Sequence, residues 1–129
     1  MKSGLKIAHW LKARPEVAHV LHPALEGDPG HAIWKRDFKG ACGLFSIVLK
    51  PCSPEAVAAF VEGLELFGIG ASWGGFESLA IPFNCSKMRT ATKWNPGGPT
   101  VRFHIGLEDA DDLIADLEEG FTKLKIAQG

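Results

Sequence analysis

The sequence lacks the features that would place it at once among membrane, secreted or nucleic-acid-binding proteins. Its opening stretch, MKSGLKIAHWLKARPEV, contains no long apolar run, so it predicts neither a signal peptide nor a membrane span. Its 14 basic and 15 acidic residues leave a formal net charge of -1, and no charge excess favours nucleic acid or an anionic membrane. We therefore expect neither of these partners.

Cysteine and the common ligand-binding motifs are also scarce. There are three cysteines (Cys42, Cys52 and Cys85) and no CxxC pair, which indicates neither a disulfide framework nor a zinc knuckle. The five histidines show no HExxH or similar ligand spacing, and no Walker-type or GxGxxG loop occurs. These absences predict a cytoplasmic protein without a metal site.

What the sequence does contain is typical of one soluble globular domain. The chain has 129 residues, of which 46% are hydrophobic and 22% are charged. This length is sufficient to bury a core without covalent cross-links. We predict a single domain over residues 1–129.

Hydrophobic periodicity predicts four helices and five extended segments. The expected helices are 2–13, 31–38, 53–68 and 108–125, the expected extended segments are 17–21, 43–50, 69–72, 77–81 and 100–107, and 82–99 has no periodicity. Segment 43–50 is apolar on both faces and is expected inside the sheet. The order has too few βαβ units for a doubly wound fold, so the predicted class is α+β: a small, mostly antiparallel sheet with helices packed on one face.

The clearest helix signal lies at 53–68. Ser53 can cap the helix and Pro54 suits its first position. The buried stripe is expected to contain Val57, Phe60, Val61 and Leu64. The first helix, by contrast, begins without a cap, which we interpret as a sign that a segment upstream is missing.

Arg102 is the most informative single residue. In the strand 100–107, alternation places Val101 and Phe103 on one face and Arg102 and His104 on the other. An arginine in the middle of a strand rarely lacks a partner. Two interpretations remain open from the residues alone: its guanidinium binds a ligand carboxylate bidentately, or it forms a structural ion pair with a local acid such as Glu77.

The stretch ASWGGFESL, residues 71–79, is the second candidate for a site. Ser72, Trp73 and the glycine pair that follows could supply backbone donors and an aromatic wall. The same residues could equally form a glycine turn in which Trp73 covers the core. An isolated turn does not distinguish these two interpretations.

Three long runs together resemble a known family. The runs are EVAHVLHPAL followed by GH..WKRDFKGACGLFSIVL, then LELFGIGASWGGFESLAIPF, then VRFHIGLEDADDLIADLEEGF. They resemble the C-terminal part of the cystathionine β-lyase family, which are fold-type-I, pyridoxal-phosphate-dependent enzymes of cysteine and methionine metabolism. The resemblance covers essentially all 129 residues. Many family members have leucine after the serine of the SxGG motif, and Trp73 at this position resembles the β-lyase branch.

The resemblance implies roles for three residues. In the family, the SxGG turn and the arginine of the VRxHIGLED strand meet at the α-carboxylate of the substrate. Arg102 would then bind the carboxylate of a sulfur amino acid, while Ser72 and Trp73 would position it. The implied reaction is β-elimination of cystathionine to homocysteine, pyruvate and ammonia.

The resemblance also implies what the chain does not supply. The family's Schiff-base lysine and phosphate-binding turn lie in a larger upstream domain, and Lys87 and Lys93 follow the SxGG motif instead of preceding it. We therefore expect no catalytic or cofactor-binding residue here, and no pyridoxal phosphate or lyase activity with this chain alone. The chain is predicted to be the substrate-side C-terminal domain of a lyase, acting within a homo-oligomer. The alternative is a non-catalytic interaction or regulatory module, or a truncated gene relic.

Overall fold

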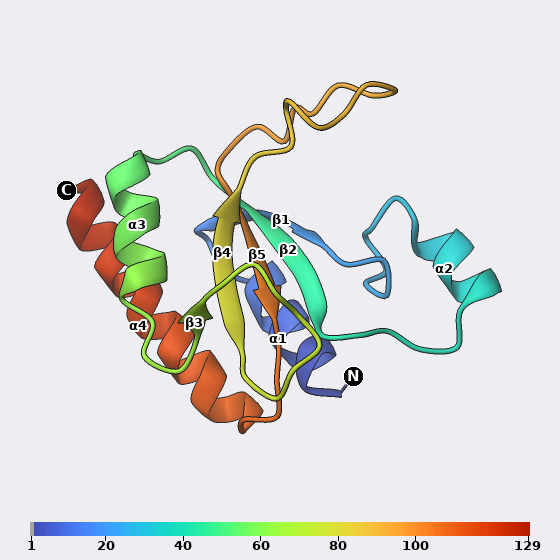
Figure 1. Cartoon of the computed structure of the whole chain (residues 1–129), viewed down its shortest axis with the longest axis horizontal. Coiled ribbons are helices and arrows are strands. Elements are labelled where there is room, and N and C mark those ends of the chain that lie inside the picture. The colour runs from blue at the N-terminus through green and yellow to red at the C-terminus, as the bar shows by residue number, and fades with distance from the viewer. Residues whose placement is uncertain (1) are drawn as a thin grey trace.

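The computed structural model describes residues 2–129, and this part of the chain forms four helices and a five-stranded sheet (Figure 1). The elements are α1 (Lys2–Lys12), β1 (Val17–Leu21), α2 (His31–Asp37), β2 (Leu44–Leu49), α3 (Pro54–Glu62), β3 (Gly68–Ile69), β4 (Leu79–Phe83), β5 (Thr100–His104) and α4 (Ala110–Gln128). Their order is the predicted one. No helix in the described residues is long and apolar enough to cross a membrane.

The sheet has the strand order β1-β2-β5-β4-β3. Three of its four pairings are antiparallel, and only the short β3 pairs with β4 in parallel. Strand β2 lies between β1 and β5, as expected for a segment that is apolar on both faces. The predicted α+β class with a mostly antiparallel sheet is therefore confirmed.

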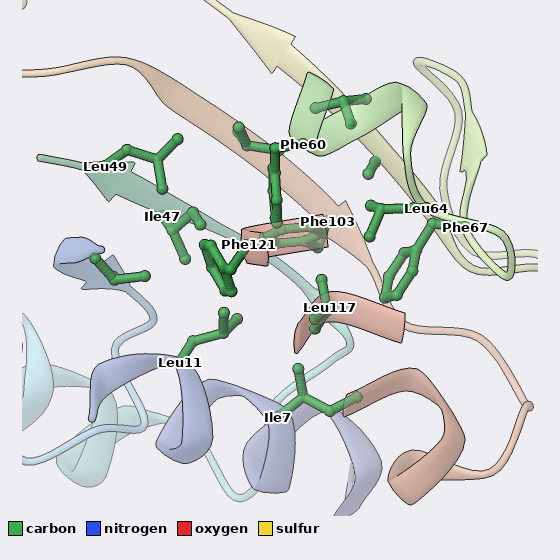
Figure 2. Packing of buried hydrophobic residues seen from close by; sticks show 14 of the residues in the cluster. Ile7, Leu11, Ile47, Leu49, Phe60, Leu64, Phe67, Phe103, Leu117 and Phe121 are labelled. Atoms are coloured by element: carbon green, nitrogen blue, oxygen red, sulfur yellow. The ribbon is translucent and has the colours of Figure 1, made fainter. Parts of the chain in front are cut away.

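Three of the helices cover one face of the sheet. In Figure 1, α1 lies behind the strands and α4 runs beside α3, whereas α2 stands apart from the other helices. Figure 2 shows the resulting core, in which the rings of Phe60 and Phe121 stack 4.6 Å apart and the Phe60 ring meets Phe103 edge-on. Ile7 and Leu11 of α1 are fully buried in the same cluster. The opening helix is thus part of the core of this chain.

The predicted helix at 53–68 is too long, because α3 ends at Glu62. Ser53 caps its start as expected, since the Ser53 hydroxyl accepts the Ala56 N–H at 3.1 Å. Beyond Gly63, the Asp116 carboxylate of α4 accepts the backbone N–H groups of the next turn, at residues 65 and 66, at 2.8 Å each. A tertiary partner therefore takes the donors that a longer helix would have used, while Leu64 remains buried as predicted.

The boundary predicted before Pro82 is also wrong, because β4 continues through Phe83. Pro82 pairs with Val101 of β5, although proline has no N–H to donate. The neighbouring β3 pairs with β4 only at Leu79 and Ala80, so the β3 side of β4 is an open edge at Pro82. Proline is tolerated at such an edge.

Candidate functional site

The candidate site lies on the sheet face that α1, α3 and α4 leave uncovered. Along β5, Val101 and Phe103 are fully buried in the core, so Arg102 and His104 project to the opposite face. The loop 70–78, between β3 and β4, passes in front of the sheet on this side (Figure 1). The structure thereby brings Arg102 together with the ASWGG stretch, which lies about thirty residues earlier in the sequence.

Arg102 is half-buried and is held by the loop. Its Nη2 atom donates a hydrogen bond to the Ala71 carbonyl, and its Cζ atom lies 5.2 Å from the centroid of the Trp73 ring. This is the geometry of a cation–π contact. Among the described residues Arg102 forms no ion pair, and Glu77 is exposed without being its partner. The structure therefore does not form the alternative ion pair, and most of the guanidinium donors are unused.

His104 holds the middle of the loop 70–78 through hydrogen bonds to its backbone. Its Nε2 atom lies 2.9 Å from the Gly75 carbonyl, and its Nδ1 atom lies 3.4 Å from the Gly74 nitrogen. A neutral ring protonated at Nε2 satisfies both contacts. Gly74 has a φ of +87°, a conformation that glycine adopts without strain. Sequence analysis assigned His104 no role beyond its place on a strand face, although its alternation with Arg102 was the available signal.

A second anchor holds the end of the loop. The Glu108 carboxylate accepts the Ser78 N–H at 3.0 Å and the Ser78 hydroxyl at 2.8 Å, and the Ser78 oxygen in turn accepts the Gly106 N–H at 2.9 Å. Burial by itself raises the pKa of Glu108, but hydrogen bonds from Ser78 and from its own backbone, with the nearby His104, bring that pKa below its ordinary value. A side chain at Gly106 would collide with the Phe76 carbonyl, so the packing requires glycine there.

The remaining two predicted residues lie on the same loop with different surroundings. Trp73 is 60% exposed, with one face against Arg102. It does not cover the core, so the interpretation of a core-covering turn is not what the structure shows. Ser72 is exposed, and its hydroxyl forms no hydrogen bond within residues 2–129. The loop and β5 together therefore present a guanidinium held by the loop, an exposed aromatic ring and an exposed hydroxyl.

The site contains no set of residues suited to hold pyridoxal phosphate. Lys87 and Lys93 belong to the loop 84–99, which extends from the end of the sheet where β4 finishes and β5 begins (Figure 1). Both ring nitrogens of His104 are taken up by the loop. The described residues thus provide neither an amine nor a phosphate cradle beside Arg102. Within that part of the chain, no group of three or more His, Cys, Asp or Glu side chains could hold a metal ion.

Two cavities of about 470 Å³ lie elsewhere in the structure. One is lined by residues of β1 and of the loop 84–99, and the other by residues around α2. Neither is lined by Ser72, Trp73 or Arg102. We assign the candidate site from the chemistry of the loop and β5, where a fixed guanidinium and an exposed aromatic ring lie together.

The α+β fold and its neighbours define the class of protein. Cystathionine γ-synthase from Xanthomonas oryzae, solved in complex with cystathionine, superposes with a TM-score of 0.82 at 32% identity, covering 98% of this chain and 34% of that one. A second solved enzyme, from Corynebacterium glutamicum, gives a TM-score of 0.78 at 33% identity, covering 95% and 32% of the two chains. These neighbours are fold-type-I pyridoxal-phosphate enzymes.

Sequence comparison gives the family directly. A family model described as Cys/Met metabolism PLP-dependent enzyme matches residues 1–122, and the chain belongs to this family. A putative cystathionine β-lyase of Rhizobium johnstonii is 52% identical over 94% of this chain, and the cystathionine β-lyase of Escherichia coli is 47% identical over 95%. The matches cover 31% and 32% of those relatives, so the chain spans about a third of their length. An L-alanine/L-glutamate racemase of Wolbachia pipientis is 41% identical, so relatives named for different reactions share this portion.

Proposed function

We propose that this chain is the substrate-side C-terminal domain of a cystathionine β-lyase-like enzyme, and that Arg102 binds the α-carboxylate of its sulfur amino-acid substrate. The observation that carries the proposal is that Arg102 is held in place without an acidic partner in the described chain. Its guanidinium is fixed on the open sheet face by the Ala71 carbonyl and the Trp73 ring, and no acid of the described chain neutralises it.

A guanidinium in this state is prepared for a carboxylate. Arginine has five N–H donors in a planar fork, and a carboxylate can accept two of them side by side. Because the loop already restricts Arg102, less side-chain freedom is lost when the ligand binds. The Ser72 hydroxyl and the Trp73 ring lie in the same loop and would limit the orientation of the bound amino acid.

The contribution of this chain is then binding and orientation. Fixing the carboxylate of an amino acid determines the direction of its Cα–H bond, which a base must reach for elimination to begin. The base and the cofactor pocket are assigned to the upstream two-thirds of the parent enzyme, so this chain alone is proposed to be inactive. The choice of β-elimination depends on the β-lyase relatives and on Trp73, because the racemase relative shows that this portion does not by itself define the reaction.

A chimaera tests the proposal. The matching third of the Escherichia coli cystathionine β-lyase is replaced by this chain, and release of homocysteine from cystathionine is measured. Arg102→Ala should lower kcat/KM by about 10²- to 10³-fold, because a charge-assisted pair is lost at a desolvated carboxylate. Arg102→Lys should recover only part of this loss, since an ammonium lacks the fork.

Arg89→Ala is the matched control. Arg89 also lies over a tryptophan, with its Cζ atom 4.8 Å from the Trp94 ring centroid, but in the loop 84–99. Its substitution should leave kcat/KM unchanged. An Arg102→Ala chimaera with normal kcat/KM, or one that loses activity only as far as it unfolds, would refute the assignment. A folded chimaera that retains its cofactor but shows no activity would favour the alternative, a non-catalytic module.

A further inference from the structure

His104 and Arg102 attach the same loop to the same strand. Residues two apart on a strand share a face, so both side chains meet the loop 70–78 from one side of the sheet. Arg102 holds the loop at Ala71. His104 holds it three positions later, at Gly74 and the residue that follows. The two predicted substrate contacts of the loop lie between these attachment points.

The segment between the attachment points depends on them for its position. The Ser72 hydroxyl forms no hydrogen bond within residues 2–129, and Trp73 is 60% exposed. The Trp73 ring contacts the Arg102 guanidinium, with 5.2 Å between the ring centroid and Cζ. Gly74 follows Trp73 directly and has a φ of +87°, so a change in its backbone would redirect the indole ring.

Of the two attachments, the one made by His104 does not involve the proposed ligand-binding group. A carboxylate that accepts the Nη2 donor of Arg102 would take this donor from the Ala71 carbonyl. The His104 ring is 9% exposed, and its two nitrogens lie 2.9 and 3.4 Å from their partners in the loop. We therefore expect the His104 attachment to persist when a ligand binds.

The chemistry of the His104 ring fits a role in holding the loop. The Gly75 carbonyl is an acceptor, so Nε2 must carry a proton, whereas the Gly74 N–H is a donor, so Nδ1 must not. Only the neutral ring protonated at Nε2 meets both conditions. Because both nitrogens are in use, the ring has no free group for a substrate.

We infer that His104 is a positioning residue of the parent enzyme. By holding Gly74 and Gly75, it keeps the Trp73 ring against Arg102 and so raises the affinity for the substrate carboxylate. This inference rests on the proposed function, because it requires that Arg102 binds that carboxylate. His104 itself touches neither the substrate nor the cofactor.

The structural part of the inference is tested on the purified chain by ¹H–¹⁵N NMR. His104→Phe retains a ring but removes both hydrogen bonds to the loop. The Arg102 Nε–H signal, which the ring current of Trp73 shifts, should then move to its position in Trp73→Ala. His19→Phe is the matched control, because His19 is an exposed histidine on the edge strand β1 whose side chain forms no hydrogen bond in the described chain. An Arg102 signal that does not move in folded His104→Phe would refute the inference.

The functional part is tested in the chimaeric lyase. His104→Phe should raise KM for cystathionine about tenfold and leave kcat within about twofold, because the carboxylate is bound in the ground state and the transition state alike. A merely structural role would instead lower kcat with the amount of folded enzyme and leave KM unchanged. The control His19→Phe should change neither constant.

His104→Gln is the conservative variant and the substitute if His104→Phe does not fold. Its amide can donate to the Gly75 carbonyl near the Nε2 position but leaves the Gly74 N–H without its acceptor. KM should therefore rise only about threefold. A normal KM in both folded variants would overturn the inference.

Arg102→Ala separates a failure of this inference from a failure of the proposed function. If Arg102→Ala leaves kcat/KM normal, the proposed function is wrong and this inference is wrong with it. If Arg102→Ala lowers kcat/KM while the His104 variants keep a normal KM, only this inference is wrong. In the Arg102→Ala background, His104→Phe should change kcat/KM by less than about twofold, since both residues act on one carboxylate contact. Effects that simply multiply would show that His104 acts by another route and would refute the positioning role.

Discussion

Removing the Glu108 carboxylate should release the end of the loop that carries Trp73. The carboxylate accepts two hydrogen bonds from Ser78, at 3.0 and 2.8 Å, and Ser78 itself is fully buried. Hydrogen bonds to charged groups contribute about 1.5–3 kcal/mol each. Glu108 is only half-buried and water can replace part of the loss, so the lower end applies. Glu108→Ala should therefore destabilise the chain by about 3 kcal/mol.

The lowered pKa of Glu108 also predicts how this stability difference changes with pH. The folded pKa of Glu108 lies below its ordinary value, because hydrogen bonds from Ser78 and from its own backbone outweigh burial, which acts in the opposite direction. A depressed carboxyl pKa contributes stability that is complete above the unfolded pKa of about 4.3 and is lost as the pH falls through the folded pKa. The difference in unfolding free energy between the natural chain and Glu108→Gln should thus be constant near neutral pH and shrink below about pH 4.3.

Urea unfolding followed by circular dichroism measures both quantities. Glu119→Ala is the control, because Glu119 is an exposed acid on α4 that forms no hydrogen bond or ion pair within the described residues. Its substitution should change the unfolding free energy by less than about 0.5 kcal/mol. In the chimaeric lyase, Glu108→Ala should raise KM while Glu119→Ala does not. Equal stabilities for the two variants, or a difference that does not shrink in acid, would refute the reasoning.

Three further predictions concern other parts of the chain. Asp116→Ala removes the acceptor of two backbone N–H groups after α3 and should cost about 2–3 kcal/mol in urea unfolding, again with Glu119→Ala as control. The chain should self-associate through the open sheet face, where Trp73 and Phe76 are 60% and 69% exposed; sedimentation velocity that shows a monomer at all concentrations would contradict this. The chain alone should retain no pyridoxal phosphate after desalting, and an imine band that borohydride traps on one lysine would show otherwise.

The self-association prediction changes in one respect once the structure is known. Ile7, Trp10 and Leu11 lie at helical spacing and form the apolar stripe of the opening helix, which a partner chain could also have covered. Instead, Ile7 and Leu11 are fully buried, and Trp10 packs partly buried against Phe121, 6.1 Å away between ring centroids. The exposed apolar side chains include Trp73 and Phe76 of the loop 70–78 and Ile33 of α2, whereas the three residues of the opening helix are not among them.

Local patterns in the sequence were sufficient for the elements and for most of the core. Alternation in β5 separated Val101 and Phe103 from Arg102, and helical spacing identified Phe60 and Leu64 as buried. Ser53 and Pro54 marked the start of α3 correctly. These features depend on neighbours within a few positions, so a single sequence contains them. The three quoted runs were likewise sufficient for the family.

The tertiary structure alone decided which residues form the site and how it is held. The contact of Arg102 with Trp73, the attachment of His104 to the Gly74–Gly75 turn and the anchor of Ser78 on Glu108 each join positions about thirty residues apart. The same holds for Asp116, whose carboxylate reaches back about fifty residues to end the turn after α3. A single sequence specifies no such distances, because hydrogen bonds between distant segments depend on how the sheet and helices pack, and only the folded chain places their donors and acceptors together.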